Sequence, residues 1–214
     1  MKNLWHKLAN AFGIQKESSN QPPPFFITLE VEVVDHAKKA IYFASGCGFL
    51  VGKYCITTRH IFPKIFPCHQ GLQDAFVRLY DYRGQYFLTL SNDKLSKIIF
   101  NDFHDIAALN LGKKFYRKKV KFIKAASLKI PVTIFRYDLI NRQLTQIFSS
   151  TIEYSLSREF LFLMPSPIQP GFSGSPVLTA NNTITGMILG NHRISKAGIA
   201  LSSQVIASFL KSLP

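Results

Sequence analysis

Cysteine is scarce in this chain of 214 residues, which contains only Cys47, Cys55 and Cys68. A secreted protein of this size more often carries an even set of disulfide-forming cysteines, and the three spacings match no zinc-binding pattern. We therefore expect free thiols in the cytoplasm or another reducing compartment. We also expect no metal site and no cofactor.

Long apolar runs are missing as well. No stretch approaches the roughly 20 uninterrupted apolar residues that a membrane-spanning helix needs. The apolar start of the chain is broken at once by His6, Lys7 and Asn10, which is untypical of a secretory signal. The sequence therefore predicts neither a transmembrane segment nor a signal peptide.

Acidic residues are few, 12 against 26 lysines and arginines, so the formal net charge is +14. Such an excess favours an anionic partner, namely nucleic acid, an anionic membrane surface or an acidic protein. The charge is concentrated in residues 113–129, inside a stretch from 106 to 137 that contains no acid. Two interpretations stay open. The segment is a solvated connector between two halves, or it is an anion-binding stripe in which Phe115, Tyr116 and Phe122 alternate with basic side chains.

Apolar material, in contrast, is plentiful. Hydrophobic residues make up 47% of the chain and 19 of them are Phe, which is enough for a sizeable core and excludes wholesale disorder. The length suits one unit or two compact barrels that share a cleft. Residues 1–24 stand apart, because 3–14 have the apolar spacing of a short helix and 15–24 form a polar, proline-rich linker. Such a helix can pack on the domain, dock on a partner or lie on an anionic membrane.

Beyond the linker the pattern is that of many short strands. The expected strands are 25–34, 40–51, 53–58, 75–82, 85–91, 97–100, 102–111, 132–136, 145–154, 160–164, 177–178, 183–189 and 198–201. Residues 202–213 predict a helix instead, because Val205, Ile206, Phe209 and Leu210 share one face at helical spacing. Short strands separated by frequent turns indicate an all-β sandwich or barrel.

One heptapeptide, Pro170 to Pro176 (PGFSGSP), carries the strongest local signal for chemistry. Glycine permits positive φ and close approach of the backbone, and proline fixes φ and removes an N–H. Ser173, between two such glycines, can sit on a tight turn with its hydroxyl presented and backbone N–H groups converging beside it. Acyl transfer needs this combination of a nucleophile and an oxyanion hole. The alternative interpretation is an ordinary surface turn.

An activated serine needs a base within hydrogen-bond reach, and that base needs an orienting acid. Of the six histidines, His60 ends an apolar strand and His104 directly precedes Asp105, which opens another. A lone histidine is more often structural, so the neighbouring residues must decide between these candidates.

Four segments together resemble the trypsin-like serine proteases. Residues 46–51 (GCGFLV) are similar to the family's G-S-G-F strand, and 56–60 (ITTRH) to its V-T-A-A-H segment. Residues 105–109 (DIAAL) are similar to its D-I-A-L-L segment, and 171–176 (GFSGSP) match its G-x-S-G-[GS]-P motif. The segments follow the family's order of His, Asp and Ser, and the resemblance covers roughly residues 25–210.

The resemblance implies the chymotrypsin fold, which is all-β and has two antiparallel six-stranded-type barrels, here with a short C-terminal helix. The N-terminal barrel would span 25–112, a basic connector 113–130, and the C-terminal barrel with its helix 131–214. The family's cysteine after the catalytic histidine is Ile61 in this chain. The likeness is therefore closer to bacterial, organellar and viral members than to disulfide-rich secreted ones, and a viral member would act in the host-cell cytoplasm.

Carried over residue by residue, the resemblance gives Ser173 as the nucleophile and His60 as the general base and acid. Asp105 would orient and stabilise the imidazolium, and the N–H groups of Gly171 and Ser173 would form the oxyanion hole. Ser175 and Asp102 are the competing serine and acid.

One departure from the family concerns Phe172, because digestive members have an aspartate there that pairs with a new N-terminus after zymogen cleavage. That switch cannot operate in this chain.

For the substrate pocket the sequence predicts walls from residues 165–170, 188–192 and 197–200, which contain no acid. The apolar residues Pro167, Ile168, Ile188 and Leu189 predict an apolar pocket and disfavour a Lys/Arg specificity. His192 is the exception, since a pocket histidine can hydrogen-bond a Gln or Glu side chain in viral and glutamyl-specific relatives.

The sequence therefore predicts a serine endopeptidase that acts on a polypeptide substrate through an acyl-enzyme. The alternative is a catalytically weak module of the same fold that binds nucleic acid or an acidic partner through its basic surface, residues 113–129 above all.

Overall fold

The computed structural model describes residues 21–35, 37–63, 74–112, 115, 119–123, 130–154, 159–165, 168–191 and 197–214. The expected helix at 3–14, most of the linker, Cys68, Pro167, His192 and much of the basic segment 113–129 lie outside these residues.

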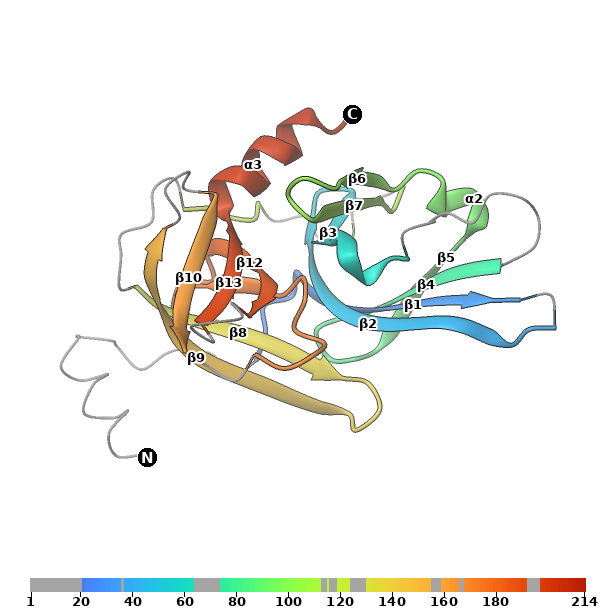
Figure 1. Ribbon diagram of the computed structural model, residues 1–214, viewed down its shortest axis with the longest axis horizontal. Helices are drawn as coiled ribbons and strands as arrows, with labels where there is room; N and C mark the ends of the chain where they lie inside the picture. The colour runs from blue at the N-terminus through green and yellow to red at the C-terminus, as the bar shows by residue number, and fades with distance from the viewer. Residues whose placement is uncertain are drawn as a thin grey trace.

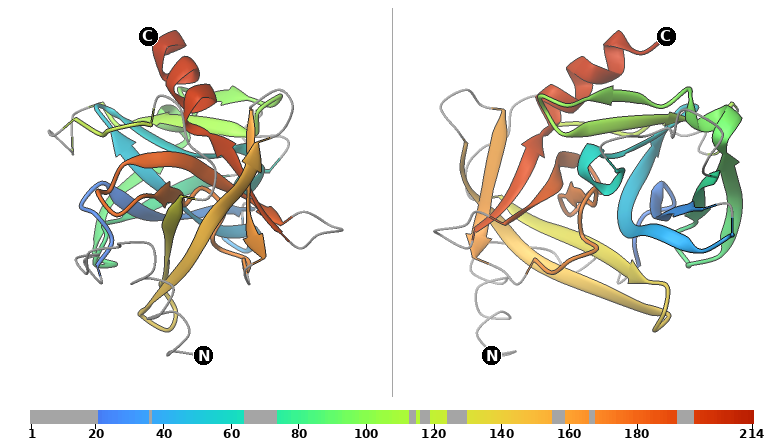
Figure 2. Two further views of the ribbon diagram at one scale, coloured as in Figure 1. Left: turned by 90° about the vertical axis from the view of Figure 1, so that its left-hand side faces the viewer. Right: turned by 45° about the vertical axis from the view of Figure 1, so that its right-hand side comes forward.

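The N-terminal half is one antiparallel sheet of seven strands, where a six-stranded barrel was expected. In spatial order the strands are β5 (Tyr86–Ser91), β4 (Asp74–Tyr80), β1 (Phe26–Val34), β2 (Ala40–Val51), β3 (Tyr54–Thr58), β7 (Ile106–Asn110) and β6 (Ile99–Asn101). The sheet curls strongly, so that its two ends approach each other on one side (Figure 2). β4 shows why these residues form strands. Ala75, Val77 and Leu79 are buried, whereas the residues between them are partly exposed, as expected for a sheet with one covered face.

The C-terminal half is a closed antiparallel barrel of six strands, which lies beside the first sheet (Figure 1). In order around the barrel these are β10 (Phe160–Pro165), β13 (Ala197–Ser202), β12 (Ile184–Asn191), β11 (Pro176–Leu178), β8 (Pro131–Asp138) and β9 (Gln143–Tyr154). The all-β fold in two antiparallel halves is thus confirmed.

Helices are few in the described part of the chain. The longest is α3 (Ser203–Ser212), which follows β13 and lies along the top of the molecule in Figure 1. It buries Ile206 and Phe209, as the sequence pattern predicts. The two shorter ones are α2 (Asn92–Leu95) and the 3-10 turn η1 (Arg59–Ile61), which follows β3.

The apolar core joins the two halves. A large cluster draws buried residues from β1 to β3 and also from β11 to β13 and α3. The rings of Phe26 and Phe135 meet edge-on across the boundary, with centroids 6.4 Å apart. A second, smaller cluster is confined to the C-terminal barrel and includes Ile134, Ile188 and Phe172.

Cys47 and Cys55 are buried free thiols. Among the described residues, no helix is long and apolar enough to span a membrane. In the same residues, histidines, cysteines and acids form no group of three or more that could hold a metal ion.

Candidate active site

The heptapeptide Pro170 to Pro176 lies where the two halves meet, and its last residue is the first residue of β11. The carbonyl oxygen of Ser173 accepts a 2.7 Å hydrogen bond from the backbone N–H of Cys47, in the middle of β2. On the other side, Gly174 donates its N–H to the carbonyl of Ile188 on β12 at 2.9 Å. The turn that carries Ser173 is therefore held by one strand from each half.

The two glycines of this turn have backbone conformations that other residues rarely adopt, with φ of +91° at Gly171 and +84° at Gly174. A Cβ at Gly174 would lie 1.9 Å from the carbonyl oxygen of Cys47 and 2.5 Å from Thr57 Oγ1. Only glycine lets the turn approach β2 this closely. The approach sets the position of Ser173 relative to the N-terminal half.

Ser175, the competing serine, is fully buried, and its hydroxyl donates a 2.7 Å hydrogen bond to the carbonyl of Phe135. Ser173 is partly exposed. Of the two hydroxyls, that of Ser173 is the one available to an incoming molecule.

His60 is the middle residue of η1, the short turn that begins directly after the last residue of β3. The backbone N–H of Arg59 donates to the carbonyl of Asp105 at 3.1 Å, and Tyr42 donates its hydroxyl to the carbonyl of Ile61 at 2.9 Å. These two contacts fix the short turn on either side of His60.

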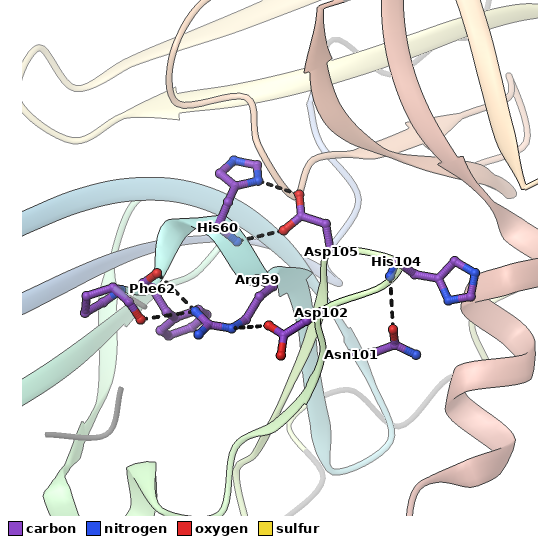
Figure 3. Close-up of polar contacts among 8 residues, drawn as sticks. Arg59, His60, Phe62, Asn101, Asp102, His104 and Asp105 are labelled. Carbon is purple, nitrogen blue, oxygen red and sulfur yellow. Dashed lines mark hydrogen bonds and ion pairs between the residues drawn. The ribbon is translucent and has the colours of Figure 1, made fainter. Parts of the chain in front are cut away.

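Asp105 holds the imidazole of His60 through both of its carboxylate oxygens. One oxygen accepts the backbone N–H of His60 at 2.8 Å, and the other lies 2.6 Å from Nδ1 (Figure 3). Asp105 itself has a positive φ of 54°, just before β7. A carboxylate at Nδ1 favours the tautomer that carries its proton there. Nε2 is then an acceptor, and it lies 2.8 Å from the hydroxyl oxygen of Ser173.

The neighbouring acid Asp102 and the neighbouring histidine His104 point elsewhere (Figure 3). Asp102 is largely exposed and accepts a 3.0 Å hydrogen bond from Arg59 Nε. His104 lies 3.3 Å from a carboxylate oxygen of Glu159. The structure therefore brings together the three residues expected from the sequence, His60, Asp105 and Ser173, and leaves the competing acid outside the group.

Gly171 and Ser173 were expected to present their N–H groups to substrate. Within the described residues, neither N–H donates to a backbone acceptor. The carbonyl of Gly171 is engaged instead, by the thiol of Cys47 at 3.3 Å. Burial raises the pKa of this thiol to about 11, so Cys47 stays protonated at neutral pH and can donate.

The expected pocket residues are only partly described. Ile168 and Ile188 are buried in the cluster of the C-terminal barrel, and Leu189 is partly buried. The side chain of Asn191 donates to the carbonyl of Ile168 at 2.6 Å, which ties the end of β12 to the segment before the turn. Pro167 and His192 lie outside the described residues.

Sequence reasoning did not single out two residues that shape the site. Thr57 is fully buried and donates its hydroxyl to the carbonyl of Cys47 at 2.6 Å, which holds β2 against β3 behind the turn. Arg136 lies beside Gly171. A buried threonine in an apolar strand gives a weak signal, and an arginine at a strand position gives none, because either contact depends on how distant segments pack.

Comparison with known proteins gives a result at the level of structure alone. No protein-family model matches the chain, and no curated protein matches its sequence. Many solved structures superpose on the chain, including the following three. The active form of the Rv3671c protease from M. tuberculosis gives a TM-score of 0.61 at 14% identity, with 86% of this chain and 79% of that chain covered.

The tobacco etch virus protease in complex with product gives a TM-score of 0.63 at 15% identity, covering 94% of this chain and 85% of that chain. The serine endoprotease from Yersinia pestis gives 0.61 at 13% identity; 88% of this chain is covered, but only 62% of that longer chain. Such low identities carry the fold and no more. The likeness to these proteases, together with two antiparallel β halves and a C-terminal helix, establishes that the chain has the chymotrypsin fold.

Proposed function

We propose that this protein is a serine endopeptidase that hydrolyses peptide bonds through an acyl-enzyme. The observation that carries the proposal is the contact series in which Asp105 Oδ2 lies 2.6 Å from His60 Nδ1 and His60 Nε2 lies 2.8 Å from Ser173 Oγ. Each distance lies within hydrogen-bond reach, and the order acid, imidazole, hydroxyl is the one that activates a serine.

In the proposed reaction Ser173 Oγ attacks the scissile carbonyl carbon, and His60 Nε2 takes the hydroxyl proton. The carbonyl oxygen becomes an oxyanion, which accepts hydrogen bonds from the N–H groups of Gly171 and Ser173. The C–N bond then breaks, and His60 gives its proton to the leaving amine. Water, activated by the same imidazole, hydrolyses the acyl-enzyme and restores the serine hydroxyl. Asp105 stays a carboxylate throughout and stabilises the imidazolium.

The substrate is a polypeptide, and its specificity pocket is proposed to lie at the segments before the turn and at the end of β12. Pro167, Ile168, Ile188 and Leu189 would give it apolar walls, and His192 would be its one polar group. The free, buried Cys47 and Cys55 suit a reducing compartment such as the cytoplasm.

Covalent labelling by a fluorophosphonate probe tests the reaction directly, because such probes react much faster with an activated serine than with an ordinary hydroxyl. We expect the wild type to be labelled at Ser173, as located by peptide mass spectrometry. Ser173→Ala and His60→Ala should each abolish labelling.

Ser175→Ala is the matched serine control and should retain labelling, since its hydroxyl is buried against Phe135. A folded wild type that resists the probe, or a Ser173→Ala variant that is still labelled, would contradict the proposal.

A second candidate function is binding of an anionic partner through the basic surface. In the described residues, several acids are already paired with cations, as in Lys38–Asp74 and Arg78–Glu32. Lys119 and Lys121 of the basic segment are exposed, whereas Phe115 and Phe122 pack against the core. The described part of the segment therefore offers charge, and its two rings, Phe115 and Phe122, are engaged in packing rather than presented for base stacking; Tyr116 lies outside the described residues. Binding of a random oligonucleotide by Ser173→Ala should weaken steeply with salt, and salt-independent binding would contradict this role.

A further inference from the structure

The turn that carries Ser173 has a phenylalanine at its centre. The side chain of Phe172 has no exposed surface and packs among the apolar residues of the C-terminal barrel, including Ile134, Ile188 and Leu163. Gly171, beside it, presents one of the two N–H groups that the proposed reaction needs. Because glycine rotates about φ and ψ at little cost, burial of Phe172 alone leaves the orientation of the Gly171 peptide free.

Arg136 covers this glycine. β8 pairs with β11 in a register that sets Ile134 opposite Val177, so Arg136 lies two residues further along β8, beside the turn that precedes β11. Its Nε would lie 2.8 Å from a Cβ placed on Gly171, and its guanidinium carbon lies 5.9 Å from the centre of the Phe172 ring. The guanidinium thus lies close to both residues that precede Ser173.

Arg136 is in turn held from the tip of the β8–β9 hairpin. One of its terminal nitrogens lies 3.1 Å from Asp138 Oδ2. Asp138 also accepts the backbone N–H groups of Ile140 at 3.0 Å and Asn141 at 3.1 Å, and the side-chain amide of Asn141. The hydrogen bonds from Asn141 lower the pKa of the Asp138 carboxyl, with a smaller contribution from Arg136. Asp138 is therefore a charged carboxylate at neutral pH, and its ion pair with Arg136 is present there.

We propose that Arg136 is the positioning residue of the oxyanion turn. It fills the space beside Gly171 and keeps that peptide in the orientation that presents its N–H to substrate. This inference rests on the proposed function. In digestive trypsin-like proteases an aspartate at the position of Phe172 pairs with a new N-terminus, and in this chain Arg136 would order the turn instead. Without the guanidinium, the hydrogen bond from the Cys47 thiol to the Gly171 carbonyl is left to hold this peptide. We expect it not to suffice, so that the peptide rotates into the vacated space and the oxyanion loses one donor.

The test compares Arg136→Ala with the wild type in fluorophosphonate labelling, since the phosphonyl oxygen occupies the oxyanion position. We expect the maximal labelling rate of Arg136→Ala to fall about 10- to 100-fold. This is no more than the fall expected when a whole oxyanion-hole donor is removed. The probe concentration at half-maximal rate should change little. The pH midpoint of labelling, which reports His60, should also stay, because the contacts of His60 to Asp105 and Ser173 do not involve Arg136.

The variant also leaves a guanidinium-sized space, which allows chemical rescue. Added guanidinium or ethylguanidinium should restore a large part of the labelling rate of Arg136→Ala, whereas sodium chloride at equal ionic strength should not. The matched control is Arg142→Ala, which removes the same charge from the exposed turn of the same hairpin and should be labelled like the wild type.

The outcomes separate the two proposals. A folded wild type that is not labelled contradicts the peptidase itself. A labelled wild type with Arg136→Ala labelled equally fast overturns the role of Arg136. A slow Arg136→Ala that guanidinium does not rescue, or whose pH midpoint moves, shows a general structural defect and overturns it as well.

Discussion

At Gly174, both the fold and the position of Ser173 depend on the absence of a Cβ atom. The φ of +84° at this residue and the 1.9 Å that would separate an added Cβ from the carbonyl oxygen of Cys47 both exclude a side chain. Gly174→Ala should lower the free energy of unfolding by about 2 to 5 kcal/mol, which combines a left-handed backbone with overpacking. Urea denaturation followed by circular dichroism measures this loss.

Gly52 provides the matched comparison, because it has φ of +61° in the turn after β2 but nothing within 4 Å of an added Cβ. Gly52→Ala should cost only the backbone share, about 1 to 2 kcal/mol. Equal losses for the two variants would show that the contact with β2 does not constrain Gly174.

The catalytic candidates and the pocket candidates differ in how far the sequence can predict them. Ser173 and His60 each lie in a short sequence motif, so the residues next to them in the chain are enough to indicate their roles. Ile168 and Ile188 are apolar, and an apolar residue fits a core and a pocket wall equally well; both are buried in the barrel. Arg136 on β8 lies beside Gly171, in the turn before the neighbouring strand β11, and no local pattern encodes that proximity.

Among the elements, the β8–β9 hairpin should make the stability of the protein depend on pH. The group responsible is Asp138, which pairs with Arg136 beside the candidate site. Asp138 accepts hydrogen bonds at the hairpin tip and has a lowered pKa, so its carboxylate stabilises the folded state above the ordinary aspartate pKa of about 4. That contribution is lost as the pH falls through the lowered value in the folded protein. Asp138→Asn should therefore melt at a lower temperature than the wild type at pH 7.

The gap in melting temperature between Asp138→Asn and the wild type should narrow as the pH falls below about 4, because the wild-type carboxyl then takes up its proton. When both proteins also carry Arg136→Ala, most of the difference in melting temperature that Asp138→Asn causes should remain. The reason is that Asn141, and not Arg136, is the main cause of the lowered pKa of Asp138. A gap that stays constant or widens from pH 7 to pH 3 would contradict this assignment.

Strands and the final helix were predictable because burial repeats every second residue in β4 and at helical spacing in α3. The turn η1 was not, since three residues are too few to show a period. The short strand β6 (Ile99–Asn101), in contrast, was predicted as a separate strand at 97–100, because the apolar residues 98–100 stand apart from those of β7.

The two halves of the protein share one apolar core and meet at the site. Phe26 on β1 contacts Phe135 on β8, and Phe49 on β2 contacts Phe122 in the connector, with ring centroids 6.4 and 6.5 Å apart. Beyond α3, the hydroxyl of Tyr54 donates to the carbonyl of Pro214, which ties the end of the chain to β3. A site built from His60 in one half and Ser173 in the other is only as rigid as this boundary.

We therefore expect the two halves to unfold together. Met187 on β12 is fully buried in the cluster that both halves share, and Met187→Ala should cost about 2 to 5 kcal/mol. Hydrogen exchange followed by mass spectrometry should show the same loss of protection in peptides from β1 as in peptides from β13, because global unfolding exposes both. Ile41→Ala, at a half-exposed position, should change neither. If Met187→Ala accelerates exchange only beyond residue 130, the halves unfold independently, and the geometry between His60 and Ser173 would have to be maintained by the contacts of the turn alone.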